Sequence, residues 1–228
     1  MVFVMGLFNN FKRKKHEKNQ QDTFSIKPDK EYLKNLIQEV NDKFSQFEYR
    51  EIPENDCVIS YIPTKKLSYV GLQSGLSEQI RLKNNNLQKN VKLRSNCKNY
   101  VRFIEKDNRI IKIENYTNGT SDCTYLAYYD NEYRYLFPYT KTGHRYPTYI
   151  SVTHIENNQV IEEYLVLKDA IIYSRYIKTD DNKIDYYFIN YVPNGKYPIL
   201  EEKTGYYLLN TLEYVEEKYY VWTQDLQQ

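Results

Sequence analysis

Residues 100–139 read YVRFIEKDNRIIKIENYTNGTSDCTYLAYYDNEYRYLFPY, and their pattern is the clearest indication of the fold in the chain. Runs of β-branched and aromatic residues alternate here with short polar clusters, the first two of which contain Asp107 and the pair Asn118-Gly119. Asn, Asp and Gly accept the left-handed backbone conformation that tight hairpin turns require. The stretch therefore predicts consecutive antiparallel strands joined by tight turns.

The same spacing continues toward the C-terminus, with turns predicted near Asp107, Gly119, Asn131, Gly143, Asn157, Lys168, Asp180, Asn194 and Thr204. Strands that follow one another every 10 to 14 residues or so leave no room for crossover helices, so they must pair antiparallel. Few runs have a cleanly polar side, which predicts a sheet partly covered on both faces. We expect an α+β fold with a long hairpin meander, built as a sheet, an open barrel or stacked hairpins.

One amphipathic helix is predicted before the meander. Pro28 suits a first helical position, and Asp29 and Glu31 favour the positive end of the helix dipole. Apolar residues then recur at steps of three and four, at Leu33, Leu36, Ile37, Val40, Phe44 and Phe47. Because such a stripe must be buried, we expect the helix to pack on one face of the sheet.

Three segments follow from these patterns. Residues 1–27 read as a basic N-terminal tail, residues 28–95 as the helix with short strands, and residues 96–228 as the meander. Within the second segment we expect strands at Cys57–Ile62 and, more weakly, Val91–Ser95, and a helical turn at Ser77–Leu82. The length suits one domain formed by residues 28–95 and 96–228 together.

The N-terminal tail and the cysteines bear on localisation. Apolar residues precede the lysines in residues 2–15, the reverse of a secretory signal, so this segment is either a solubilising tail or a peripheral membrane contact. We favour the tail. Cys57, Cys97 and Cys123 are odd in number and widely spaced, which predicts reduced thiols and a cytoplasmic protein.

Two hairpin motifs carry a family resemblance. Asn115-Tyr116-Thr117-Asn118-Gly119 and the stretch from Asn190 to Lys196 both place a Tyr before an Asn-Gly turn, in units of about 24 residues. This resembles the bacterial repeats of the YwqK antitoxin and MORN type. The resemblance implies a stacked-hairpin sheet that binds another protein in toxin immunity, without catalytic residues.

The usual enzyme signatures are missing from the sequence. It contains no phosphate-binding loop, dinucleotide fingerprint, nucleophile elbow or H-E-x-x-H motif. A metal role for His144 or His154 would need convergent carboxylates, and the nearby Glu156 sets no ligand spacing. We predict no catalytic residue, no metal and no cofactor. An enzyme with an unrecognised active site, such as a metal-independent nuclease using a histidine with Arg145 and Tyr146, stays as an alternative.

Charge is divided along the chain. Lys and Arg outnumber Asp and Glu by 8 in residues 1–114, whereas Asp and Glu exceed them by 6 in residues 115–228. In the basic half and its border, cations interleaved with aromatics suit a surface for single-stranded nucleic acid or RNA. The residues of this alternative nucleic-acid face are Arg94, Lys98, Arg102, Arg109, Lys112, Tyr129 and Arg134.

The acidic half is mixed with tyrosines, which number 26 in the chain. Either an AT-rich coding sequence or a binding surface explains this abundance. An acidic, aromatic surface suits the capture of a basic protein. Its predicted residues are Glu162, Glu163, Asp180, Asp181, Tyr186 and Tyr187, within an acidic region that extends to Glu213, Glu216 and Glu217. The favoured function is therefore a non-enzymatic, cytoplasmic binding protein of the immunity or inhibitor type, which occludes a basic toxin or effector.

Overall fold

The structure is a computed structural model that describes residues 28, 30–63, 80, 83, 89, 90, 92–157, 159–193 and 199–223, with backbone alone at 199 and 221–223. The predicted tail of residues 1–27, with its possible membrane contact at residues 2–15, lies outside the described residues. So do most of the helical turn predicted at Ser77–Leu82 and the turn predicted near Asn194.

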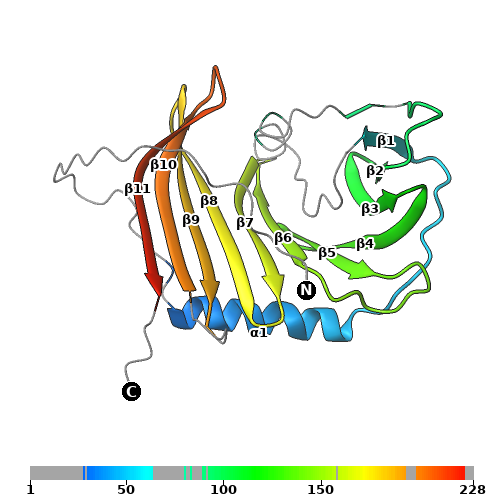
Figure 1. Cartoon of the computed structure of the whole chain (residues 1–228), viewed down its shortest axis with the longest axis horizontal. Coiled ribbons are helices and arrows are strands. Elements are labelled where there is room, and N and C mark those ends of the chain that lie inside the picture. Colours follow the sequence, from blue (N-terminus) through cyan, green and yellow to red (C-terminus); the bar gives the residue numbers. More distant parts are fainter. Residues whose placement is uncertain are drawn as a thin grey trace.

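Eleven antiparallel strands form one sheet in which the spatial order equals the chain order, from β1 to β11. The strands are β1 (Val58–Pro63), β2 (Tyr100–Lys106), β3 (Arg109–Thr117), β4 (Thr120–Asp130), β5 (Tyr133–Tyr139), β6 (Ile150–Glu156), β7 (Gln159–Leu167), β8 (Ala170–Asp180), β9 (Lys183–Val192), β10 (Ile199–Leu208) and β11 (Glu213–Thr223). The sheet is strongly curved but open, with β1 and β11 as its two edges (Figure 1). The predicted α+β meander is therefore confirmed as an open sheet.

Turn chemistry explains most of the hairpins. Asp107, Asn118, Asn131 and Asn157 all adopt a positive φ between 50° and 53°, directly after β2, β3, β4 and β6. Asn and Asp tolerate this left-handed conformation better than other non-glycine residues. The turns predicted near these four residues are confirmed.

The turn predicted at Thr204 is wrong, because Thr204 lies in the middle of β10. The ladder between β10 and β11 shifts its register between Thr204 and Gly205, which is a β-bulge. A Cβ atom at Gly205 would lie 2.2 Å from the carbonyl oxygen of Val215, so the glycine permits a close backbone approach and makes no turn. A second prediction is also wrong: residues 92–95, described from the weak strand predicted at Val91–Ser95, form no strand.

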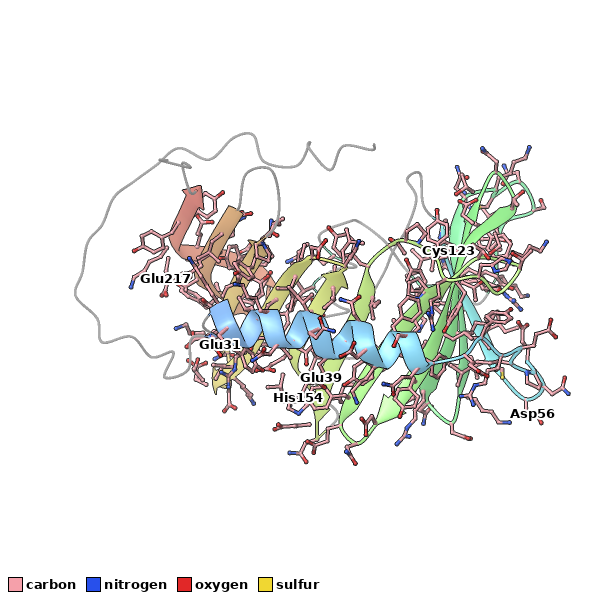
Figure 2. All side chains as sticks on the ribbon, turned by 90° about the horizontal axis from the view of Figure 1, so that it is seen from below. Glu31, Glu39, Asp56, Cys123, His154 and Glu217 are labelled. Carbon is pink, nitrogen blue, oxygen red and sulfur yellow. The ribbon has the colours of Figure 1, made fainter. Side chains whose placement is uncertain are left out.

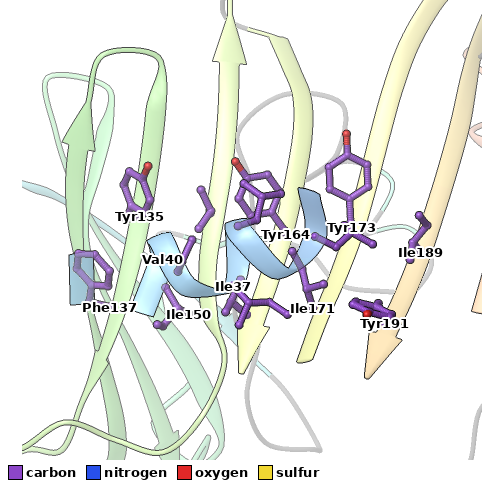
Figure 3. Close-up of a cluster of buried hydrophobic side chains, with 14 of the residues drawn as sticks. Ile37, Val40, Tyr135, Phe137, Ile150, Tyr164, Ile171, Tyr173, Ile189 and Tyr191 are labelled. Atoms are coloured by element: carbon purple, nitrogen blue, oxygen red, sulfur yellow. The ribbon is translucent and has the colours of Figure 1, made fainter. Parts of the chain in front are cut away.

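Helix α1 (Lys30–Gln46) crosses the strands on one face of the sheet, as Figure 2 shows from below. Its predicted apolar stripe is buried at Leu33, Leu36, Ile37 and Val40, against side chains of β4 to β9 (Figure 3). The Phe44 ring continues the stripe and stacks on Phe137 with 5.2 Å between ring centroids. The predicted docking of the helix is confirmed.

The opposite face of the sheet is also covered. One cluster there joins β1 to β5 through buried side chains such as Val101, Phe103 and Ile113. Another joins β7 to β10 with Ile80, which belongs to the connection between β1 and β2. Burial on both faces explains why the strand sequences lack a cleanly polar side.

Candidate functional site

The outer edge of β11 is the longest unpaired strand edge in the described part of the chain. β11 runs for 11 residues, and its register with β10 accounts for one side only. Among the described residues, no strand pairs with its other side. Unpaired backbone N–H and C=O groups along such an edge are ready to pair with another chain.

The side chains of β11 are acidic and aromatic. Tyr219 and Tyr220 are 50% and 49% exposed, on opposite faces because they are neighbours in a strand. The strand also exposes four charged residues, which are Glu213, Glu216, Glu217 and Lys218. The Lys203 ammonium lies 4.8 Å from the centroid of the Tyr219 ring, which holds that ring beside β10. This set, residues 213–220, is called the β11 edge below.

The first sheet edge, β1, is protected instead. It has only six residues and ends in Pro63, which has no N–H to donate. Tyr61 and Asn90 exchange two backbone hydrogen bonds of 2.6 and 2.7 Å, so a short segment already covers the middle of this edge.

The six residues of the predicted acidic-aromatic face do not form one surface. Glu162 and Glu163 are consecutive in β7 and point to opposite faces of the sheet. Glu163 is buried, and it accepts a hydrogen bond of 3.2 Å from the Tyr176 hydroxyl. Tyr187 is buried in the core under α1.

The remaining members lie elsewhere. The Glu162 carboxylate accepts a hydrogen bond of 2.7 Å from the Tyr173 hydroxyl and lies 3.5 Å from Nε of Arg175. Tyr186 is partly buried and packs against the cluster that joins β7 to β10. Asp180 and Asp181 are exposed at the β8–β9 turn. Of the acidic region, the part brought to one exposed strand is Glu213, Glu216 and Glu217, on β11.

The seven residues of the alternative nucleic-acid face are also divided. Arg94 and Lys98 are exposed in the connection before β2. Arg134 is 1% exposed and points away from the α1 face, where its Nη2 lies 3.3 Å from the Thr153 hydroxyl. A phosphate cannot reach a guanidinium buried in this way.

Arg102 and Lys112 lie close together on the face of the sheet opposite to Arg134, but they surround carboxylates. Arg102 donates to Glu114 at 2.8 Å and to Glu54, and Lys112 lies 2.8 Å from Glu114 and 3.2 Å from Glu54. We call these four residues the β1-end ion network. It fixes the loop after α1, which carries Glu54, to strands β2 and β3.

The network shifts the pKa values of its members. The hydrogen bond from Arg102, opposed in part by burial, lowers the pKa of Glu54. Burial alone would lower the pKa of Lys112, but the hydrogen bond and the charge of Glu114 outweigh burial and raise it. Charges neutralised inside the protein are poor anchors for a phosphate backbone.

Arg109 and Tyr129 are also in contact, at a place where β3 and β4 part. The Arg109 guanidinium carbon lies 5.3 Å from the Tyr129 ring centroid, and the Tyr129 hydroxyl donates a 2.9 Å hydrogen bond to the Ile110 carbonyl. The ladder between β3 and β4 ends at Lys112 and Leu126. A hollow of about 740 Å³ opens here, with both charge signs on its rim. It is lined by Arg50, Glu51, Ile52, Pro53, Asn55, Asp56, Lys106, Ile111, Ala127, Tyr128 and Tyr129.

The three cysteines are free thiols, as predicted, and burial raises the pKa of the Cys123 thiol to about 12. A thiol with such a pKa is a poor nucleophile at neutral pH. Within the described residues, no helix has the length and apolar character needed to cross a membrane.

Sequence reasoning missed two features of the surface. It grouped Glu213, Glu216 and Glu217 with the acidic region but did not place them on an open edge, because a predicted turn at Thr204 disrupted the last two strands. It also missed Glu132, which the β5–β6 register brings beside His154. The β-favouring residues of Glu213–Thr223, mainly tyrosines and valines, are the signal that could have found the first.

Searches against known proteins identify no relative. No protein-family model, no curated protein and no solved structure matches this chain. The resemblance to YwqK and MORN repeats therefore stays a prediction.

Proposed function

We propose that the protein is a non-enzymatic binding protein of the inhibitor type, which captures a basic partner protein along the β11 edge. The observation that carries this proposal is the 11-residue strand β11, which contains two half-exposed tyrosines and pairs on only one of its sides with a described strand. A partner strand that adds to such an edge gains backbone hydrogen bonds along its length.

The side chains of the edge favour a partner of opposite charge. Three glutamates and one lysine are exposed on β11, which leaves a net charge of −2 from four residues (3 acidic, 1 basic). Acidic residues steer a basic partner toward the edge and disfavour acidic ones. Tyrosines are frequent anchors at protein interfaces because they bury a large area and lose little side-chain freedom.

Occlusion is the mode of action that suits this geometry. A partner segment that pairs with β11 becomes an additional strand of the sheet, so it is fixed in an extended conformation. Such a segment can no longer fit its own substrate or target. Inhibition in this way needs no catalytic group on the binding protein.

Quantitative capture from the native host's lysate, after nuclease treatment and followed by mass spectrometry, tests the proposal. The wild-type chain is compared with the charge reversal Glu213→Lys/Glu216→Lys/Glu217→Lys and with Tyr219→Ala/Tyr220→Ala. We expect one basic protein to be captured by the wild type in a nuclease-resistant, stoichiometric complex. The amount of partner captured should fall at least about tenfold with both variants, which is a typical effect at interface anchors.

Two matched variants serve as controls. Asp42→Lys/Glu48→Lys/Glu51→Lys makes the same change in net charge at three exposed carboxylates of α1 and the following loop, and Tyr32→Ala removes a 45%-exposed tyrosine from α1. Both should capture the partner as the wild type does. Capture that disappears with nuclease, or that survives in the β11 variants, contradicts the proposal.

A further inference from the structure

Glu132, His154 and Glu156 converge at one point between the β4–β5 turn and the end of β6. The Nε2 atom of His154 lies 3.4 Å from a carboxylate oxygen of Glu132 and 3.2 Å from one of Glu156. One possible ligand atom from each side chain lies within 4.8 Å of the other two. The structure thus brings together a mixed set of one nitrogen and two oxygen donors.

The backbone and a stacked ring hold these donors in place. The N–H of Ile155 donates a 2.8 Å hydrogen bond to the Glu132 carbonyl, which ties the β4–β5 turn to β6. Tyr133 lies opposite His154 in the ladder, and the two rings stack with 4.4 Å between centroids. The imidazole is therefore oriented before any ligand arrives, as a preorganised site requires.

Hydrogen bonding does not account for both carboxylates. The Nε2 atom carries at most one proton, so it cannot donate a well-directed hydrogen bond to Glu132 and to Glu156 at once. A single metal ion would instead be coordinated by all three groups at once, since one ligand atom of each lies within 4.8 Å of the other two. Tetrahedral bonds of about 2.0–2.1 Å to nitrogen and oxygen place two ligand atoms about 3.3 Å apart, which agrees with the two separations from His154.

We propose that Glu132, His154 and Glu156 bind one divalent transition-metal ion of the zinc class. The imidazole nitrogen favours Zn²⁺ over Mg²⁺, which prefers oxygen ligands and retains its water. Three protein ligands leave a further coordination position for water or for a group from outside the chain. This proposal replaces the sequence-based expectation of no metal site.

The arrangement of exposure supports access by an ion. The side chain of His154 is 13% exposed, whereas those of Glu132 and Glu156 are 62% and 46% exposed. The nitrogen ligand is thus fixed against the sheet and the two carboxylates reach from the solvent side. The metal proposal is independent of the β11 edge, since none of its residues lies on β9, β10 or β11.

Calorimetric titration of the metal-free full chain with Zn²⁺ tests the site. We expect one ion per chain, and no comparable binding of Mg²⁺. His154→Ala, Glu132→Gln and Glu156→Gln should each weaken Zn²⁺ binding at least about tenfold, since even outer-shell changes reach that size. Glu132 lies in an exposed turn, so Glu132→Gln keeps the test decisive if His154→Ala disturbs folding.

His144→Ala is the matched control, because His144 is exposed in the connection between β5 and β6 and does not belong to the cluster. It should bind Zn²⁺ as tightly as the wild type. Titration with Co²⁺ adds a spectroscopic readout, in which nitrogen and oxygen ligands give visible bands without thiolate charge transfer. Wild-type affinity in Glu132→Gln and Glu156→Gln, a thiolate band, or no saturable Zn²⁺ binding overturns the proposal.

Discussion

The two edges of the sheet are built in opposite ways. At the β1 end a six-residue strand stops at a proline, Asn90 covers its middle, and the β1-end ion network fills the face beside it. At the β11 end an 11-residue strand carries exposed tyrosines and glutamates along an edge that no described strand covers. Since exposed edges invite association, proteins usually protect them.

This difference separates residues that stabilise the fold from residues that are available to bind a partner. Buried side chains and neutralised charges lie at the β1 end, so changes there should act on the free energy of unfolding. Exposed groups lie at the β11 end, so changes there should act on binding. Substitutions at the two ends therefore test whether stability depends on the β1 end and binding on the β11 end.

The largest effect is expected in the core of the β1 end. Phe103 on β2 is fully buried, so Phe103→Ala should lower the free energy of unfolding by about 3–5 kcal/mol through lost burial and the cavity left behind. Tyr219→Ala at the β11 edge should change it by less than about 0.5 kcal/mol, as surface substitutions usually do. Urea unfolding of both variants measures the difference, and equal losses would contradict the contrast between the ends.

The next effect concerns the β1-end ion network. Glu114 is 7% exposed and contacts both Arg102 and Lys112, so Glu114→Gln leaves two partly buried cations less compensated. We expect a loss of about 1–3 kcal/mol in the free energy of unfolding. Glu217→Gln, at an exposed position of β11, is the control and should be neutral. A loss of the same size in both variants would show that the network does not stabilise this end.

Removing the cover of the first edge has a smaller effect. Asn90→Pro deletes the N–H that donates to the Tyr61 carbonyl, which should cost about 1 kcal/mol and expose β1 to pairing with other chains. Analytical ultracentrifugation should detect more self-association in this variant than in the wild type. Asn90→Ala keeps the N–H and should stay like the wild type. Unchanged association in Asn90→Pro would mean that Asn90 does not protect the edge.

The smallest effect is a pH dependence at the β1 end. Because the folded-state pKa of Glu54 is lowered below its ordinary value of 4.5, its stabilisation is present above that pH and is lost as pH falls through the lower folded pKa. The difference in melting temperature between wild type and Glu54→Gln should therefore shrink when the pH is lowered below about 4.5. A difference that stays constant from neutral to strongly acidic pH would contradict the shift.

The strands and most turns were predictable because their signals are local. Asn118-Gly119 or Asn131 dictates a turn by its own backbone preference, and the stripe from Leu33 to Val40 dictates a buried helix face. The turn predicted near Thr204 is wrong, and the neighbouring Gly205 shows the difficulty, since glycine serves a turn and a close strand contact equally well in sequence. Only the position of Val215 decides between the two.

The face on which each candidate-site residue lies depends on the register between paired strands, which local sequence does not reveal. Arg134 and Glu163 look like surface charges until strand alternation and the packed opposite face bury them. Glu132 and His154 are 22 residues apart and meet because β5 and β6 pair at Tyr133 and His154. A shift of one residue in that pairing would turn the His154 side chain to the other face.

Hydrogen–deuterium exchange of the chain, alone and in complex with the captured partner, tests directly whether the partner binds along the β11 edge. We expect amide exchange in the complex to slow mainly within Glu213–Thr223, because a partner strand pairs with the outer N–H groups of β11, while β1 stays unchanged. Slowed exchange concentrated at Arg94–Lys112, with β11 unchanged, would contradict the β11 edge as the binding site.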